Sequence, residues 1–128
     1  MKLEVLPWLI LFLPLTVGGK VVYTARFVPR RLFELMRHHR PTGFVGVPAM
    51  YNALLSDRTA TSADFTSYRY LISGGEPLSS RLRERFEERF GIAISQGYGL
   101  TETSAVLNWC RPEDHKPESV GKPLPGVE

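Results

Sequence analysis

The sequence has 128 residues, the length of a single domain, and 43% of them are hydrophobic while 23% are charged. This balance excludes global disorder and supplies enough apolar side chains for a packed core. The net charge of +3, from 16 lysines and arginines against 13 acidic residues, is too small to argue for nucleic-acid binding. Cys110 is the only cysteine, which excludes an internal disulfide and a cysteine metal cage and favours a reducing compartment.

The amino-terminal run Val5–Val17, "VLPWLILFLPLTV", is strongly apolar. It is shorter than the about 20 residues that a transmembrane helix needs. Lys2 is the one positive charge before it, Glu4 offsets that charge, and no small-residue cleavage site follows. We expect this run to be buried core; a signal or membrane segment and a damaged chain boundary are the alternatives.

The next segment pairs a strand pattern with a helix pattern. Lys20–Tyr23 predicts a short strand, and Pro29 begins a helix that we expect to end near His39. Five arginines lie between residues 26 and 40 against one glutamate. This pattern is typical of a solvated helix face, with a phosphate- or membrane-facing patch as the alternative.

Two more strands and another helix are predicted between residues 44 and 73. Phe44–Val47 is rich in β-forming residues, and Pro48 begins the helix that follows it. A polar loop is expected from Ser56 to Ser67, and Arg69–Ser73 then predicts a strand.

The third helix has the clearest pattern. Ser79 or Ser80 is suited to its N-cap and Gly91 to its carboxyl end. Arg83 and Glu87 are spaced to form an exposed ion pair. Apolar side chains recur every four residues, at Leu78, Leu82, Phe86 and Phe90.

The last predicted strand is Ile92–Ser95, followed by a polar loop and a Pro/Gly-rich end. The whole order, strand and helix in alternation with short connections, predicts an α/β fold with a mostly parallel sheet and helices on both faces. Parallel strands place the loops after Val47, Ser73 and Ser95 on one edge of the sheet. Such edges bind ligands, so we expect a site there.

The residue types in these loops suit a nucleotide and a metal ion. Gly97 and Gly99 permit close backbone approach, and Tyr98 between them offers a flat apolar face and a hydroxyl. Thr101 can donate a hydrogen bond to a phosphate oxygen. Glu102 is an oxygen ligand of the kind that Mg²⁺ prefers. Spacing alone also allows ordinary strand-to-helix turns. His38, His39 and His115 have no metal-ligand spacing, and we expect them to be exposed.

Two segments make a family recognisable: "LISGGEPLSSRLRERFEERFG" and "ISQGYGLTETSA". They closely resemble the AMP-forming adenylating enzymes, the superfamily of acyl-CoA synthetases, luciferases and peptide-synthetase adenylation domains. "TGFVGVPAMYNALL" and "SVGKPLPGVE" fit the same pattern, and the details are most similar to fatty-acyl-CoA ligases. The resemblance implies that residues 1–128 are part of one AMP-binding domain, a flavodoxin-like subdomain of a larger enzyme, with no second domain.

The resemblance also implies residue roles. It implies an adenine site made by two loops, which comprise Gly74, Gly75, Glu76, Pro77, Gln96, Gly97, Tyr98 and Gly99. It implies that Thr101 contacts the α-phosphate and that Glu102 binds Mg²⁺, both serving catalysis. The acyl group is implied to lie near Gly46, Val47, Pro48, Gly99 and Leu100.

The implied substrates are ATP, CoA and a fatty or other carboxylic acid, with Mg²⁺ as metal and AMP as product. The implied location is cytoplasmic, with peripheral membrane contact left open. The family's phosphate loop, ribose-binding aspartate and carboxyl-terminal catalytic lysine are not found in these residues, nor does a Pro-x-x-His-x-x-Gly element begin at Pro7. We therefore expect an internal piece that needs the missing parts of its parent enzyme for activity. The alternative is a non-catalytic α/β binding or interaction module with residual affinity for adenine nucleotides.

Overall fold

The computed structural model describes residues 14–103, 105–111, 113, 116 and 118–127, and at Thr101 and Ala105 only the backbone. Of the apolar run expected as buried core, only residues 14–17 are among them, and His115 also lies outside the described residues. In chain order the elements are α2 (Pro29–His39), β1 (Gly43–Gly46), α3 (Pro48–Ser56), the 3-10 helix η1 (Ser62–Phe65), β2 (Tyr70–Ser73), α4 (Ser80–Phe90), β3 (Ile94–Leu100), the 3-10 helix η2 (Thr101–Thr103), β4 (Ala105–Trp109) and β5 (Lys122–Pro123).

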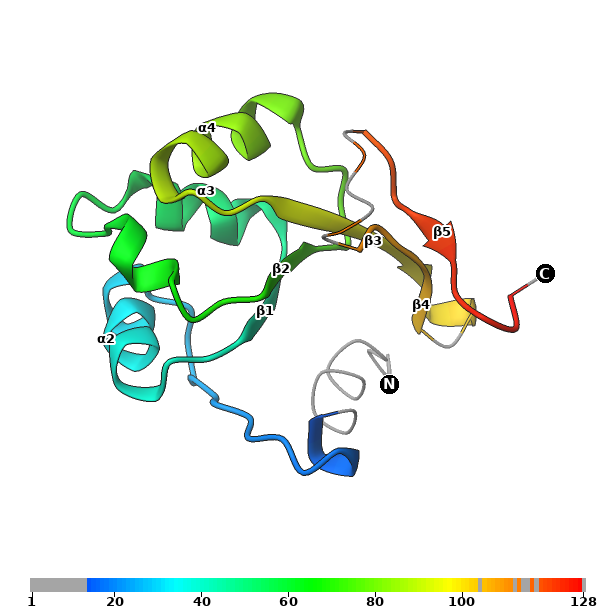
Figure 1. Cartoon of the computed structure of the whole chain (residues 1–128), viewed down its shortest axis with the longest axis horizontal. Coiled ribbons are helices and arrows are strands. Elements are labelled where there is room, and N and C mark those ends of the chain that lie inside the picture. The colour runs from blue at the N-terminus through cyan, green and yellow to red at the C-terminus, as the bar shows by residue number, and fades with distance from the viewer. Residues whose placement is uncertain (1–13, 104, 112, 114–115, 117, 128) are drawn as a thin grey trace.

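One sheet joins the five strands in the order β1-β2-β3-β4-β5. The pairs β1–β2 and β2–β3 are parallel, while β3–β4 and β4–β5 are antiparallel. Figure 1 shows α3 and α4 on the same side of the parallel strands, with β4 and β5 extending beyond the helices. The expected α/β fold with a mostly parallel open sheet is confirmed. The predicted helices on both faces are not seen among the described residues, because α2, α3 and α4 pack into one core.

The helix ends follow from local chemistry. α2 and α3 each begin with a proline, whose missing N–H costs nothing in the first turn. At α4 the Ser79 side chain accepts a hydrogen bond from the Leu82 backbone N–H at 3.3 Å, which confirms the predicted cap. Gly91 ends α4 in the left-handed conformation with φ of 70°.

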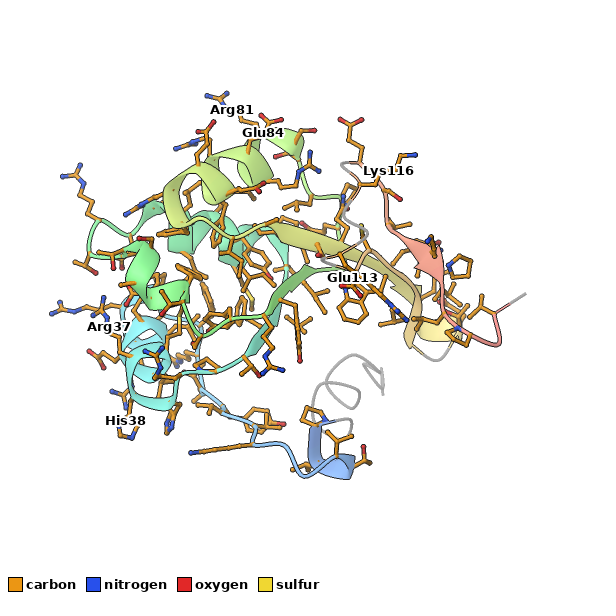
Figure 2. The ribbon with its side chains drawn as sticks, viewed as in Figure 1. Arg37, His38, Arg81, Glu84, Glu113 and Lys116 are labelled. Carbon is orange, nitrogen blue, oxygen red and sulfur yellow. The ribbon has the colours of Figure 1, made fainter. Side chains whose placement is uncertain are left out.

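The side chains between the sheet and the helices form one hydrophobic core, rich in aromatic rings (Figure 2). Phe65 of η1 is central, since its ring contacts those of Phe33, Tyr68, Phe86 and Phe90. The buried hydrophobic residues of the cluster are Phe33, Met36, Tyr51, Leu54, Leu55, Ala60, Phe65, Tyr68, Leu71, Leu78, Phe86, Phe90 and Ile94. This core covers one face of the sheet and fixes the strands whose ends carry the predicted site.

Outside the candidate site, three further sequence predictions were wrong in detail. Lys20–Tyr23 is not a strand, since Tyr23 is 62% exposed and the segment pairs with no strand of the described sheet. Residues with high β propensity are stabilised mainly by packing against neighbouring strands, and this segment has none. The loop from Ser56 to Ser67 contains η1, which the sequence reading missed. Arg83 is buried in α4, and the described part of the chain shows no ion pair between it and Glu87.

Within the described residues, no helix has the length and apolar character required to cross a membrane.

Candidate functional site

The carboxyl ends of β1, β2 and β3 meet at one edge of the sheet. Gly46, Ser73 and Gln96 are neighbours there, because Gly46 pairs with Ser73 and Ser73 pairs with Gln96 in the parallel ladders. The loops after Gly46 and Ser73 therefore begin side by side, next to the second half of β3. This arrangement confirms the predicted meeting of the three segments.

The first component of the site is the Gly74–Leu78 turn, which follows β2. The Gly74 backbone N–H donates to the Gly46 carbonyl at 3.1 Å, and the Leu78 backbone N–H donates to the Gln96 side-chain oxygen at 3.3 Å. Gly75 has a φ of +83°, a conformation that residues with a Cβ rarely adopt. Between the two bonds, Gly75 and the two residues after it, Glu76 and Pro77, are exposed. The turn is thus held at both ends and presents its middle to solvent.

The second component is the latter half of β3. The sequence predicted a loop after Ser95, but the strand continues to Leu100, because its residues from Gly97 onward pair with β4. The register shifts between Tyr98 and Gly99, which marks a β-bulge. The Tyr98 side chain is 44% exposed, so its ring is available to a ligand.

Two glycines bring these components together. A Cβ built on Gly74 would lie 3.7 Å from the Gly97 carbonyl oxygen, so the two backbones approach without an intervening side chain. A Cβ built on Gly75 would lie 3.6 Å from Val47 Cγ1, which links the turn to the residue after β1. The result is a bare strip of backbone at the sheet edge, a surface that a planar ligand can approach closely.

The third component is η2, which follows β3 and carries Glu102. The Thr103 hydroxyl accepts from the Leu100 backbone N–H at 3.2 Å and donates to the Leu100 carbonyl at 2.9 Å. Thr103 therefore closes this turn, a role that the sequence reading did not assign, although hydroxyl side chains often bond to nearby backbone groups. Glu102 is exposed. The side chain of Thr101, predicted to contact phosphate, lies outside the described part of the structure.

The residues expected near an acyl group are split between two places. Gly46 is buried, and a Cβ there would lie 2.9 Å from the Phe44 ring and 3.3 Å from Met50 Sδ, so the position has no room for a side chain. Pro48 begins α3 directly after Val47. Gly99 and Leu100 are on β3, and β2 lies between β3 and β1, the strand that carries Gly46. Leu100 is 46% exposed.

Glu102, the predicted metal ligand, has no cluster of acids around it in the described part of the chain. Within the described ranges, no group of three or more His, Cys, Asp or Glu side chains is placed to hold a metal ion. A single carboxylate still suits Mg²⁺, which takes one or two protein carboxylates and completes its shell with phosphate oxygens and water. Glu102 therefore fits as a ligand that works with a bound phosphate.

The arginines of the basic stretch are partly neutralised. Arg37 binds Asp64 through two hydrogen bonds of 2.6 and 3.2 Å, and Arg31 pairs with Glu34 at 2.7 Å. Figure 2 shows Arg37 and His38 on the outer side of α2. These contacts favour the solvated helix face over a phosphate-binding patch.

The Asp64 carboxylate is a structural anchor for η1. Burial raises its pKa, but the hydrogen bonds from Arg37 and from the Thr61 backbone, together with the Arg37 charge, outweigh burial and lower the pKa overall. The Thr61 backbone N–H donates to Asp64 at 2.9 Å, which completes a capping box. This network ties α2 to η1 and lies away from the predicted site.

A shallow depression of about 560 Å³ lies elsewhere, lined by residues that include Tyr68, Arg69, Gly91 and Ile92. These residues precede β2 and β3, so the depression is at the amino ends of the strands, on the edge opposite the glycine loops. Ligands of parallel sheets bind at the carboxyl ends. We therefore assign the candidate site to the glycine loops.

The chain matches a family model described as AMP-binding enzyme over residues 5–128. It is 35% identical to a benzoate–CoA ligase of Thauera aromatica, over 91% of this chain and 22% of that protein. It is 32% identical to a long-chain-fatty-acid–CoA ligase of Yersinia pestis, over 93% of this chain and 21% of that protein. Among solved structures, ATP-bound MatB from Rhodopseudomonas palustris is similar with a TM-score of 0.75 and 32% identity, over 84% of this chain and 21% of that one.

The chain thus spans about a fifth of the length of the curated relatives it matches. The match covers the candidate site, since it runs from residue 5 to residue 128. Glycine turns at the carboxyl edge of a parallel sheet, an exposed tyrosine on β3 and a carboxylate after it agree with that match. The chain belongs to the family of AMP-binding enzymes.

Proposed function

We propose that this chain is the nucleotide-binding part of an AMP-forming acid–thiol ligase. In this reaction a carboxylate oxygen attacks the α-phosphorus of ATP and the bond to pyrophosphate breaks, which gives an acyl-adenylate. The CoA thiol then attacks the acyl carbon, and AMP leaves as the thioester forms. The observation that carries the proposal is the close approach of Gly74 to Gly97, 3.7 Å from a built Cβ to the carbonyl oxygen, at the carboxyl edge of parallel strands.

Each component then has a task in binding. The bare backbone at Gly74, Gly75 and Gly97 receives the adenine, and the exposed Tyr98 ring supplies a face for it. η2 presents Glu102 after β3, where the nucleotide phosphates follow the base. Mg²⁺ bound by Glu102 and the phosphates would neutralise charge that builds on the phosphate oxygens during the reaction.

The acyl substrate in this proposal is a carboxylic acid, and a fatty acid in particular. Relatives are named for benzoate and for long-chain fatty acids, so the family handles acids of different shape. The candidate acyl contacts, Gly46 to Pro48 together with Gly99 and Leu100, are apolar, which suits a hydrocarbon chain. A cytoplasmic location goes with the proposal, since the sequence has one cysteine and therefore no internal disulfide.

The test is ATP–pyrophosphate exchange with a full-length protein that carries this sequence, assayed against benzoate, octanoate and palmitate. We expect acid-dependent exchange, which Glu102→Gln reduces strongly. Glu84→Gln, on the outer side of α4 (Figure 2), is the matched control and should leave exchange unchanged. AMP binding without exchange by the full-length protein would instead favour the non-catalytic binding module.

The 128-residue chain by itself should not adenylate any of these acids. It holds the candidate adenine and Mg²⁺ residues, but the family's phosphate loop and catalytic lysine are not among its residues. Each lost charge-stabilising group costs roughly 10²–10³ in rate. Acid-dependent exchange by the purified chain, free of contaminating ligase, would contradict this expectation.

A further inference from the structure

Ser73, the last residue of β2, has a buried hydroxyl group without a partner. The residue is 1% exposed, and within the described part of the chain its Oγ atom has no hydrogen-bond partner. Buried hydroxyl groups are nearly always hydrogen-bonded, and an unpaired one lowers the stability of the fold. An unpaired hydroxyl group directly before the glycine turn of the candidate site therefore calls for an explanation.

The strand pairing shows on which face of the sheet this hydroxyl group lies. Ser73 pairs with Gln96 of β3, two residues after the pair of Leu71 and Ile94. Leu71 and Ile94 are buried in the core beneath the helices. Alternate residues of a strand share a face, so the side chains of Ser73 and Gln96 lie on the core face as well.

The Gly74–Leu78 turn begins and ends beside Ser73. It leaves β2 directly after this residue, and it returns to the Gln96 side chain, whose oxygen accepts from the Leu78 backbone N–H at 3.3 Å. The middle of the turn, from Gly75 to Pro77, is exposed, and among the described residues no hydrogen bond holds it to the sheet. An unpaired hydroxyl group and an unfastened stretch of backbone therefore adjoin each other.

We propose that Ser73 is a positioning residue whose hydroxyl group pairs with the turn when a nucleotide binds. The middle of the turn then moves toward the sheet, and one of its backbone groups forms a hydrogen bond with Ser73 Oγ. The unpaired hydroxyl group lowers the stability of the ligand-free chain, and its pairing strengthens nucleotide binding. The inference rests on the proposed nucleotide site, and it adds a residue that is not among the predicted nucleotide contacts.

A water molecule bound at Ser73 is the alternative, and the sign of one stability change separates the two. If Ser73 Oγ is unpaired in the ligand-free chain, Ser73→Ala removes a buried polar group without breaking a hydrogen bond, so it should be neutral or stabilising. If the hydroxyl group already held a water molecule, the same substitution would break that bond and lower the melting temperature.

Ser95→Ala is the matched control. Ser95 is also buried, with 2% exposure, and it lies on the neighbouring strand β3. It precedes Gln96 and pairs with Ile72, so its side chain lies on the face of the sheet opposite to that of Ser73. The substitution removes a buried hydroxyl group of the same kind without touching the core face below the turn.

The experiment records melting curves and titrates AMP by calorimetry for the 128-residue chain and the two variants. Ser73→Ala should melt between the temperature of the unmodified chain and about 4 °C above it. It should bind AMP about three- to tenfold more weakly, whereas Ser95→Ala should keep the unmodified affinity. Saturating AMP should slow the exchange of the Gly75 and Glu76 backbone amides about tenfold in the unmodified chain, measured by NMR, and much less in Ser73→Ala.

A lower melting temperature of Ser73→Ala would overturn the inference, because the hydroxyl group would then already stabilise the ligand-free fold. Unchanged AMP affinity in Ser73→Ala, or an equal loss in Ser95→Ala, would overturn it as well. A failure of the unmodified chain to bind AMP would contradict the proposed function and with it the movement of the turn. A raised melting temperature of Ser73→Ala would in that case still support the unpaired hydroxyl group.

Discussion

The substitution Gly74→Ala should weaken ligand binding while leaving the stability of the fold almost unchanged. Gly74 lies outside the left-handed region, and the nearest atom to a built Cβ is 3.7 Å away, an ordinary van der Waals contact. Gly74→Ala should therefore change the free energy of unfolding by less than about 0.5 kcal/mol. Gly75→Ala is the matched variant, since its φ of +83° strains an alanine by about 1–2 kcal/mol.

Gly75→Ala should mainly lower the melting temperature, whereas Gly74→Ala should mainly lower the affinity for AMP. Gly75→Ala should melt about 4–8 °C lower, taking about 4 °C per kcal/mol for a domain of this size, while Gly74→Ala should melt within about 2 °C of the unmodified chain. The new methyl group of Gly74→Ala lies on the backbone strip that faces Gly97, so AMP affinity should fall about tenfold or more. Circular dichroism melts and titration calorimetry measure the two effects. Full AMP affinity in Gly74→Ala would refute the placement of the base on this strip.

Three further substitutions test other parts of the structure. In a full-length protein, Glu102→Gln should lower adenylation by about 10²-fold and leave the melting temperature unchanged, because the side chain is exposed; equal losses of activity and stability would make Glu102 structural. Ser79→Ala removes the bond to the Leu82 N–H and should cost about 1 kcal/mol in a denaturant titration, whereas Ser79→Asp should keep most of it. The pKa of Asp64 is lowered in the folded state, so its contribution to stability is present above the unfolded value near 3.8 and is lost as the pH falls through the folded value. Melts from pH 6 to pH 2 should show a flatter decline for Asp64→Asn, and an unchanged slope would contradict this assignment.

The sequence predicted the elements whose ends have local chemical signals. Pro29 and Pro48 mark the starts of α2 and α3, and Ser79 and Gly91 bracket α4, so these helices were located correctly. The parallel order of β1, β2 and β3 followed from the alternation of strands and helices. The meeting of the loops at one edge is a geometric consequence of that order.

The errors concern structure that depends on distant partners. Gly97 and Gly99 suggested a loop, yet β4 pairs with this segment and extends β3 to Leu100. Lys20–Tyr23 has the composition of a strand but no neighbour in the described sheet. The missed η1 had a local signal, since Thr61 and Asp64 have the spacing of a capping box. The engagement of Gln96 with Leu78 could not be read from composition, because it depends on how a strand and a turn meet.

The pairing of β3 along its length indicates which part of the candidate site can adjust to a ligand. Its first residues pair with β2 and its last residues pair with β4, so paired backbone joins Gly97 to the turn that carries Glu102, with one register shift between Tyr98 and Gly99. At about 3.3 Å per residue, the three strand steps from Gly97 to Leu100 span at most about 10 Å. A nucleotide at this edge would contact strand β3 on one side, where the backbone is paired with its neighbours. On the other side, the exposed middle of the Gly74–Leu78 turn is fastened only at its ends, so we expect the turn and not β3 to adjust to a ligand.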